Sequence, residues 1–327
     1  MMTFRTTAVA ALALTLLGGA AAAAPAGKLV LYTSQPPADA QQTVDAFMAK
    51  YPDVQVEWTR DGTTRIMSKL QAEFAAGAPQ PDLLLIADAV TMEGLKADGR
   101  LMAYDDAPVA GYPESYYDAD KTYFGTKLIT SGIAYNTKAD KPTSWTDLTE
   151  AAAKNQVVMP SPLYSGAAAI MMGTLTDQPS LGWDFYEGLA KNGTTSVQGN
   201  GAVMKAVAGG EKLYGVLVDF MALNAKRAGS PIDFVFPKEG VPAVTEPVAI
   251  LSTARNPEAA KAFVAFLLSP EGQAFTARQG YLPALPSVEP PAGFPPVSEI
   301  KVLATDNAKV LRNDQPNKQR FADLFGG

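Results

Sequence analysis

Hydrophobic runs of strand length alternate with amphipathic stretches of helix length from Lys28 onwards. Residues 28–33 form an apolar run, and residues 38–50 place Val44 and Phe47 on one face at helical spacing. The same succession of strand and helix recurs through the following segments and resumes in the second half of the chain. This pattern predicts an α/β protein.

The segment 81–88 has the sequence Pro-Asp-Leu-Leu-Leu-Ile-Ala-Asp. Its apolar residues are continuous and do not alternate with polar ones, which is typical of a strand in a parallel sheet covered on both faces. Ligands of such sheets bind beyond the carboxyl ends of the strands. Here those ends are near Ser34, after the first strand, and near Asp88.

A helix is predicted to begin at Ser165, because serine is a good N-cap and Gly166, Ala167 and Ala168 precede an apolar run. None of these residues is acidic, so the positive end of the helix lacks a side-chain anion. Such an end suits an external anion, because its N–H groups and dipole both favour negative charge. The alternative is an ordinary serine-capped helix whose small residues pack against a sheet.

The N-terminus has the layout of a secretory signal peptide. A charged start with Arg5 precedes the apolar residues 8–17 and a run of small residues that ends at Ala24. The apolar segment is shorter than the roughly 20 residues that span a bilayer. We therefore expect residues 1–24 to be removed and the mature protein to be soluble in the periplasm.

Composition restricts the chemistry. The chain has 327 residues, 47% of them hydrophobic, which is enough for two lobes with large cores. A net charge of −6 without a basic cluster argues against nucleic acid as a partner. The absence of Cys and His excludes thiolate and imidazole metal sites, Cys nucleophiles and Ser-His-Asp triads. No cofactor and no enzymatic activity are expected.

Several motifs together resemble the solute-binding proteins of bacterial ABC importers, in the type II branch that contains the ferric-ion-binding proteins. They are the strand at 81–88, Tyr-Asn at 135–136, Ser-Trp-Thr-Asp-Leu at 144–148, and the segment 256–273, which reads Asn-Pro-Glu-Ala-Ala to Ser-Pro-Glu-Gly-Gln. The resemblance implies the two-lobe periplasmic-binding-protein fold, a permease as partner, a monomer, and hinge closure around a small-molecule ligand.

The resemblance also implies where the lobes lie in the chain. Lobe 1 is expected to comprise residues 25–128 plus 245–285, and lobe 2 residues 129–244 plus 286–327. Two extended crossover strands, near residues 125–134 and 245–251, are expected to form the hinge.

Iron-binding members of this branch carry a His, a Glu and a Tyr-Tyr pair at places that look like Pro36, Ala87 and Phe220-Met221 here. The resemblance therefore argues against iron, and no metal site is expected. The same members hold a phosphate on a Ser-Gly-Ala helix start and a nearby Asn. Ser165, Gly166, Ala167 and Asn200 match that anion site.

Asp88 and Asp219 end two strands, one from each expected lobe, so in this fold both are expected to face the cleft. The alternative for each is a carboxylate that caps a helix or a turn. Two carboxylates beside an anion site suit a zwitterion, whose ammonium group would pair with Asp219 and Asp88. The resemblance then extends to the 2-aminoethylphosphonate-binding members, and 2-aminoethylphosphonate is the expected ligand.

Further residues are expected to support the site. Ser34 and Thr64 would donate hydroxyl hydrogen bonds, and Tyr164 would close over the ligand, although capping or packing also explains these residues. Lys127, near the first crossover, is a candidate countercharge for the anion.

The sequence leaves a wider range of ligands and activities open. One possibility is a different phosphorylated solute, such as a sugar phosphate or phosphocholine, and another is a polyamine held by the carboxylates alone. A phosphate-ester or phosphonate hydrolase is a remote possibility, because Ser165 has no evident base in the sequence.

Overall fold

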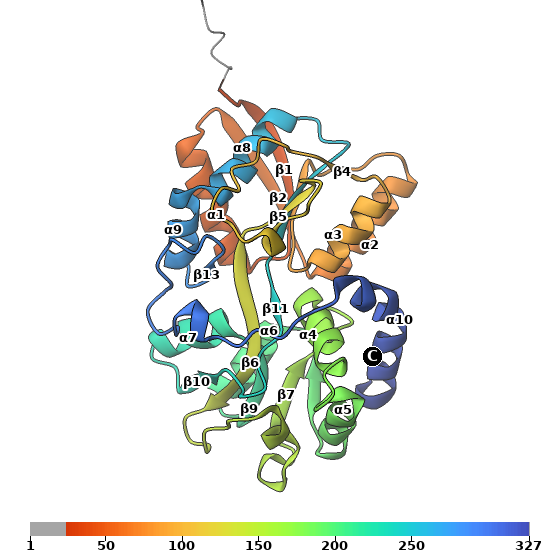
Figure 1. Cartoon of the computed structure of the whole chain (residues 1–327), viewed down its shortest axis with the longest axis vertical. Helices are drawn as coiled ribbons and strands as arrows, with labels where there is room; N and C mark the ends of the chain where they lie inside the picture. The colour runs from red at the N-terminus through yellow and green to blue at the C-terminus, as the bar shows by residue number, and fades with distance from the viewer. Residues whose placement is uncertain (1–23, 327) are drawn as a thin grey trace, which may run out of the picture.

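A computed structural model of the protein describes residues 24–326. The predicted signal peptide, apart from Ala24, lies outside the described residues. The chain forms two α/β lobes, one above the other in Figure 1, each built on its own sheet. This arrangement confirms the predicted two-lobe fold.

The first lobe contains a six-stranded sheet in the order β2-β1-β3-β12-β4, with β5 paired to β12. Its strands are β1 (Gly27–Thr33), β2 (Val54–Arg60), β3 (Leu83–Leu85), β4 (Leu101–Met102), β5 (Tyr123–Gly125) and β12 (Pro247–Leu251). Its helices are α1 (Pro37–Lys50), α2 (Thr63–Ala75), α3 (Ala89–Ala97), α8 (Pro257–Leu268) and α9 (Pro270–Arg278).

Strand β3 shows why this sheet is apolar on both faces. Leu83 and Leu85 pack into the cluster that holds Phe47 of α1 and Phe263 of α8. Leu84 points the other way, into the cluster of Ile66 from α2. Because side chains alternate along a strand, a continuous apolar run is required when helices cover both faces.

The second lobe contains a seven-stranded sheet in the order β10-β6-β9-β7-β8, with β11 and β13 also paired to β6. Its strands are β6 (Lys127–Asn136), β7 (Val157–Pro160), β8 (Thr195–Val197), β9 (Tyr214–Val218), β10 (Ile232–Val235), β11 (Ala243–Val244) and β13 (Leu282–Pro283). Its α-helices are α4 (Gly166–Thr176), α5 (Gly182–Lys191), α6 (Asn200–Ala208), α7 (Asp219–Arg227) and α10 (Asn307–Phe325). Short 3₁₀ helices cover Glu114–Tyr116, Trp145–Thr149, Ala151–Ala153 and Val297–Glu299.

Two crossovers connect the sheets, as predicted. One passes from β5 to β6 and the other from β11 to β12. The exact lobe boundaries stay a prediction. Strand β13 pairs with β6 at Leu128 and Lys127, and all of these residues fall in the segments assigned to lobe 1.

Helix α10 joins the lobes away from the hinge. It packs on α4 and α5 of the second lobe and also on α3 of the first (Figure 1). Phe321 of α10 is buried in a second-lobe cluster, and Arg320 pairs with Glu187 of α5 at 2.8 Å. No helix among residues 24–326 has the length and apolar character of a membrane span.

Candidate functional site

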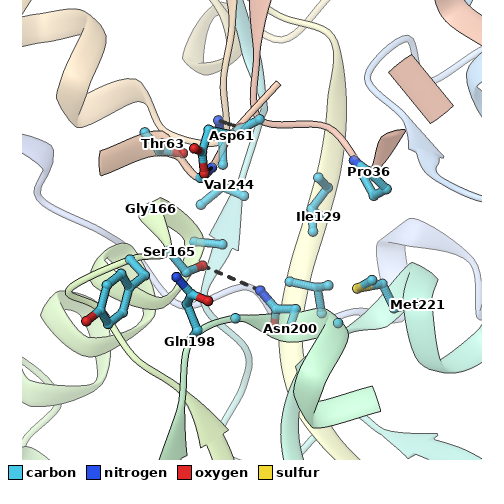
Figure 2. A pocket seen from close by; sticks show the side chains of 18 of the residues that line it. Pro36, Asp61, Thr63, Ile129, Ser165, Gly166, Gln198, Asn200, Met221 and Val244 are labelled. Atoms are coloured by element: carbon cyan, nitrogen blue, oxygen red, sulfur yellow. Dashed lines mark hydrogen bonds between the residues drawn. The ribbon is translucent and has the colours of Figure 1, made fainter. Parts of the chain in front are cut away.

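A cavity of about 400 Å³ lies between the lobes and is lined by residues from both. The first lobe contributes Ser34, Pro36, Arg60, Asp61, Gly62, Thr63, Arg65 and Ala87. The second lobe contributes Ile129, Tyr164, Ser165, Gly166, Ala167, Gln198, Gly199, Asn200, Gly201, Ala202, Val218, Phe220 and Met221. The second crossover contributes Val244 and Glu246. Figure 2 shows Asp61 and Thr63 on one side, opposite Ser165, Gln198 and Asn200 on the other.

Five of the described helices begin at this cavity. Helices α1 and α7 follow Pro36 and Val218 and have Asp39 and Asp219 in their first turns, and the other three are α2, α4 and α6. Helix α4 is capped by Ser165, whose Oγ accepts a hydrogen bond from Ala168 N at 3.3 Å, as predicted. Helices α2 and α6 begin after Gly62 and Gly199, neither of which has a side-chain cap. None of α2, α4 and α6 has an acidic residue in its first turn. Their N-terminal N–H groups and dipoles therefore give the cavity a positive potential from both lobes.

The sequence-predicted anion residues lie together. Ser165, Gly166, Ala167 and Asn200 all line the cavity. Asn200 Nδ2 donates to Ser165 Oγ over 3.5 Å, which links the starts of α6 and α4 (Figure 2). Segments 35 residues apart in sequence thus form one polar surface that can receive an anion.

Two arginines that the sequence analysis did not identify also line the cavity. Arg60 ends β2, and its Nε donates to Gln35 O at 2.7 Å, which leaves its other N–H groups without a partner among residues 24–326. Arg65 lies in the first turn of α2, 3.6 Å from the carboxylate of Asp61. The sequence signal was their position at the end of a strand and the start of the next helix, on the same sheet edge as Ser34.

Lys127 is not available as the countercharge. It forms a buried ion pair with Glu246 at 2.7 Å, and its Nζ lies 4.0 Å from the ring centroid of Tyr281. Glu246 lines the cavity and Lys127 lies outside the lining. The hypothesis that Lys127 faces a bound anion is therefore wrong, because its charge balances that of Glu246.

The two strand-end carboxylates, Asp88 and Asp219, lie outside the cavity lining, contrary to the prediction that they face the cleft. Asp219 Oδ2 accepts hydrogen bonds from Thr130 N at 2.9 Å and Thr130 Oγ1 at 2.8 Å. Its Oδ1 accepts from Phe220 N at 2.6 Å. Asp88 is the N-cap of α3, and its Oδ1 accepts from Thr91 N at 2.6 Å. Both carboxylates accept hydrogen bonds from donors of the fold, and Asp88 Oδ2 lies against Gly166 of the second lobe.

The three supporting residues have different positions. Ser34 and Tyr164 line the cavity, and Ser34 Oγ accepts from Ala87 N at 2.9 Å. Thr64 lies outside the lining, and its neighbour Thr63 takes the expected place. A helix of 3.6 residues per turn points successive side chains about 100° apart, so the sequence position was wrong by one residue.

Burial of Asp219 makes stability depend on pH. Burial raises the pKa of this carboxyl from its ordinary 3.8 to about 7, although the Thr130 and Phe220 donors lower it. The folded state therefore keeps a proton that the unfolded chain releases as the pH rises from about 4 to about 7. Over this window the free energy of unfolding should fall by about 4 kcal/mol.

We expect Asp219→Asn to remove this pH dependence, because the amide does not titrate. Urea unfolding between pH 4.5 and 8 measures how the free energy of unfolding changes with pH. Thr130→Ser is the control, because it keeps the hydroxyl donor and should keep the wild-type slope of this free energy against pH. A slope that is equally steep in Asp219→Asn would contradict the assignment.

The places where the resemblance puts iron ligands are also in the cavity. Pro36, Ala87, Phe220 and Met221 all line it. The first three have no side-chain donor atom, and the thioether of Met221 is a poor ligand for ferric iron. Among residues 24–326, no group of three or more Asp, Glu, His or Cys side chains is placed to share a metal ion. These residues add apolar side chains to the cavity lining.

Comparisons with known proteins agree with this architecture. The sequence profile described as bacterial extracellular solute-binding protein matches residues 32–274. An uncharacterized protein of Haemophilus influenzae is 27% identical over 308 residues, which cover 88% of this chain and 87% of that protein.

Two solved structures share the fold. The periplasmic binding protein AfuA of Actinobacillus pleuropneumoniae, with fructose-6-phosphate bound, superposes with a TM-score of 0.81 at 23% identity, covering 91% of this chain and 98% of AfuA. Iron-bound HitA of Pseudomonas aeruginosa gives a TM-score of 0.79 at 22% identity, covering 90% of this chain and 99% of HitA. One fold thus holds a sugar phosphate in one protein and iron in another, so the ligand must be inferred from the cavity.

Proposed function

Because this chain belongs to the bacterial extracellular solute-binding protein family, it is a periplasmic solute-binding component of an ABC-type importer, and we propose that its solute is a small organic phosphate or phosphonate. The interlobe cavity would hold the solute, and hinge closure would present it to the permease.

The observation that carries this proposal is the convergence of three helix N-termini without acidic first turns on one cavity. A second set of groups supports it. Arg60 and Arg65 add positive charge from the first lobe, and Ser165 and Asn200 add polar groups from the second. Of the two lining carboxylates, Glu246 is balanced by Lys127 and Asp61 lies beside Arg65. The balance of charge favours an anion.

Within this class, 2-aminoethylphosphonate is our narrower proposal, with a different partner for its amine. Asp219 and Asp88 are held by internal hydrogen bonds, so the ammonium group would have to pair with Asp61 or Glu246. A phosphorylated sugar is the second candidate, because a cavity of about 400 Å³ leaves room for a larger molecule than an aminophosphonate. Its hydroxyl groups would donate to the same carboxylates.

A polyamine ligand and a hydrolase activity receive less support. A polyamine has no anionic group to meet the helix N-termini and the two arginines, so its ammonium groups would enter a cavity whose charge favours an anion. A hydrolase would need a base beside Ser165, whose Oγ is bonded to Ala168 N and Asn200 Nδ2 among the described residues. Members of the family are transport binding proteins.

Isothermal titration of mature protein, stripped of ligand by unfolding and refolding, tests the proposal. The panel contains 2-aminoethylphosphonate, fructose 6-phosphate, inorganic phosphate, putrescine and ferric citrate. We expect saturable binding of one of the organic anions at micromolar or better affinity, about −8 kcal/mol. Binding of putrescine or ferric citrate alone would contradict the proposal.

Ser165→Glu tests where the anion binds. The new carboxylate would occupy the start of α4 and repel the anion, so we expect titration to detect no binding. Ser269→Glu is the matched control, because Ser269 caps α9 in the same way but lies outside the cavity lining. Unchanged affinity in Ser165→Glu would place the anion elsewhere.

A further inference from the structure

Asp88 of the first lobe lies against the helix end that would bind the solute. Its side chain is 4% exposed, and Oδ1 accepts from Thr91 N to cap α3. Oδ2 faces Gly166, the first residue of α4, so closely that a Cβ on Gly166 would overlap it. Ala87 and Gly166 both line the cavity, so this carboxylate lies directly behind the cavity wall.

The charge of Asp88 has no dedicated cation among the described residues. Helix α10 brings Lys318 and Asp314 near it, but these two pair with each other at 2.7 Å. Helices α2 and α4 bring Thr63 and Gly166, which are uncharged. Burial raises the pKa of the Asp88 carboxyl above its ordinary value. Besides the start of α3, which Asp88 caps through Thr91 N, the positive end of α4 is the helix terminus that this carboxylate faces.

We propose that Asp88 sets the charge selectivity of the closed cleft, because its carboxylate competes with the anionic group of the solute for the N-terminus of α4. This inference rests on the proposed binding of an anion at that helix end. When the lobes close, both negative charges face the first turn of one helix across a low-dielectric contact. A solute with less negative charge, or a protonated Asp88, relieves the repulsion.

The competition makes binding depend on pH in one direction. A bound anion favours the protonated form of Asp88, so binding takes up a proton. The affinity of the wild-type protein for an anion should rise as the pH falls. Titration of the phosphate itself is common to wild type and variants, so their difference isolates the carboxyl group.

Asp88→Asn tests the inference, because asparagine keeps the α3 cap and removes the charge. Asp88→Ser places a second neutral capping residue there, so an effect shared by both variants comes from loss of the charge and not from misfolding of one of them. Asp306→Asn is the matched control, since Asp306 caps α10 through Lys309 N and lies outside the cavity lining. The probes are fructose 6-phosphate and 2-aminoethylphosphonate, titrated at pH 5.5 and 8 in two buffers of different ionisation enthalpy.

At pH 8 we expect both Asp88 variants to bind the probes about tenfold more tightly than wild type. We expect this gain in affinity to shrink at pH 5.5 and to be larger for the more highly charged fructose 6-phosphate. We also expect the proton uptake that accompanies binding to wild type to be lost in the variants. Equal or weaker binding with the wild-type pH profile would overturn the inference and leave the proposed function intact. Failure of both probes to bind wild type and all variants would overturn the anion site and this inference together.

Discussion

Replacing Gly166 with alanine is expected to weaken solute binding about thirtyfold, corresponding to about 2 kcal/mol, while the protein still folds. A Cβ at this position would overlap Asp88 Oδ2 and lie 2.9 Å from Thr63 Oγ1. Both obstacles belong to the first lobe, whereas Gly166 belongs to the second. The methyl group therefore opposes closure of the lobes without disturbing α4, where alanine is a good helix former.

Gly62→Ala is expected to act in the same way from the other side. A Cβ on Gly62 would lie 2.7 Å from the backbone oxygen of Tyr164, in the second lobe. The matched control is Gly201→Ala, because Gly201 lines the same cavity and a Cβ there meets nothing within 4 Å.

Titration with the best ligand of the panel, together with thermal unfolding without ligand, measures both effects. Equal affinities in Gly166→Ala and Gly201→Ala would contradict the idea that the lobes close by direct contact at these glycines.

Lys127→Met is expected to lower the free energy of unfolding by about 3–5 kcal/mol, because it leaves a buried carboxylate without its cation. The exposed fractions of the paired side chains are 3% for Lys127 and 4% for Glu246. The remaining partner of Glu246 is Gln35, whose Nε2 donates to Oε2 at 3.1 Å. Glu246 also has a φ of 39°, a left-handed conformation that a non-glycine residue adopts at a cost.

Urea unfolding at neutral pH measures the loss. Lys28→Met is the matched control, since the Lys28–Glu57 pair is about half exposed and should contribute less than about 1 kcal/mol. The double variant Lys127→Met/Glu246→Gln should recover much of the stability, because no unpaired charge is left. A loss for Lys127→Met as small as that for Lys28→Met would show that the pair does not hold the crossovers.

The sequence predicted the strands and the anion residues where local chemistry was sufficient. Leu83 to Leu85 form a strand because only a sheet covered on both faces accommodates a continuous apolar run. Ser165 begins a helix because its hydroxyl accepts the N–H of Ala168, a bond between residues three apart. Asn200 was joined to this site through the resemblance to a known family, and the fold brings it there.

The direction of a charged side chain was not predictable in the same way. Asp219 ends at the cleft edge of its strand, but Thr130, 89 residues away in sequence, provides two donors and turns it inward. Lys127 is bound by Glu246, on the other crossover. Arg60 and Arg65 line the cavity, with Gln35 O and the Asp61 carboxylate as their nearby acceptors.

The sequence by itself determined the α/β fold class, the helix start at Ser165 and the small residues that follow it, because these depend on periodicity and on neighbours within a few positions. The tertiary structure decided which charges face the solute and that Asp88 meets Gly166 across the lobes. The physical reason is that a buried carboxylate or ammonium group must be paired wherever it lies, and its partner comes from a distant segment that only the folded chain brings near.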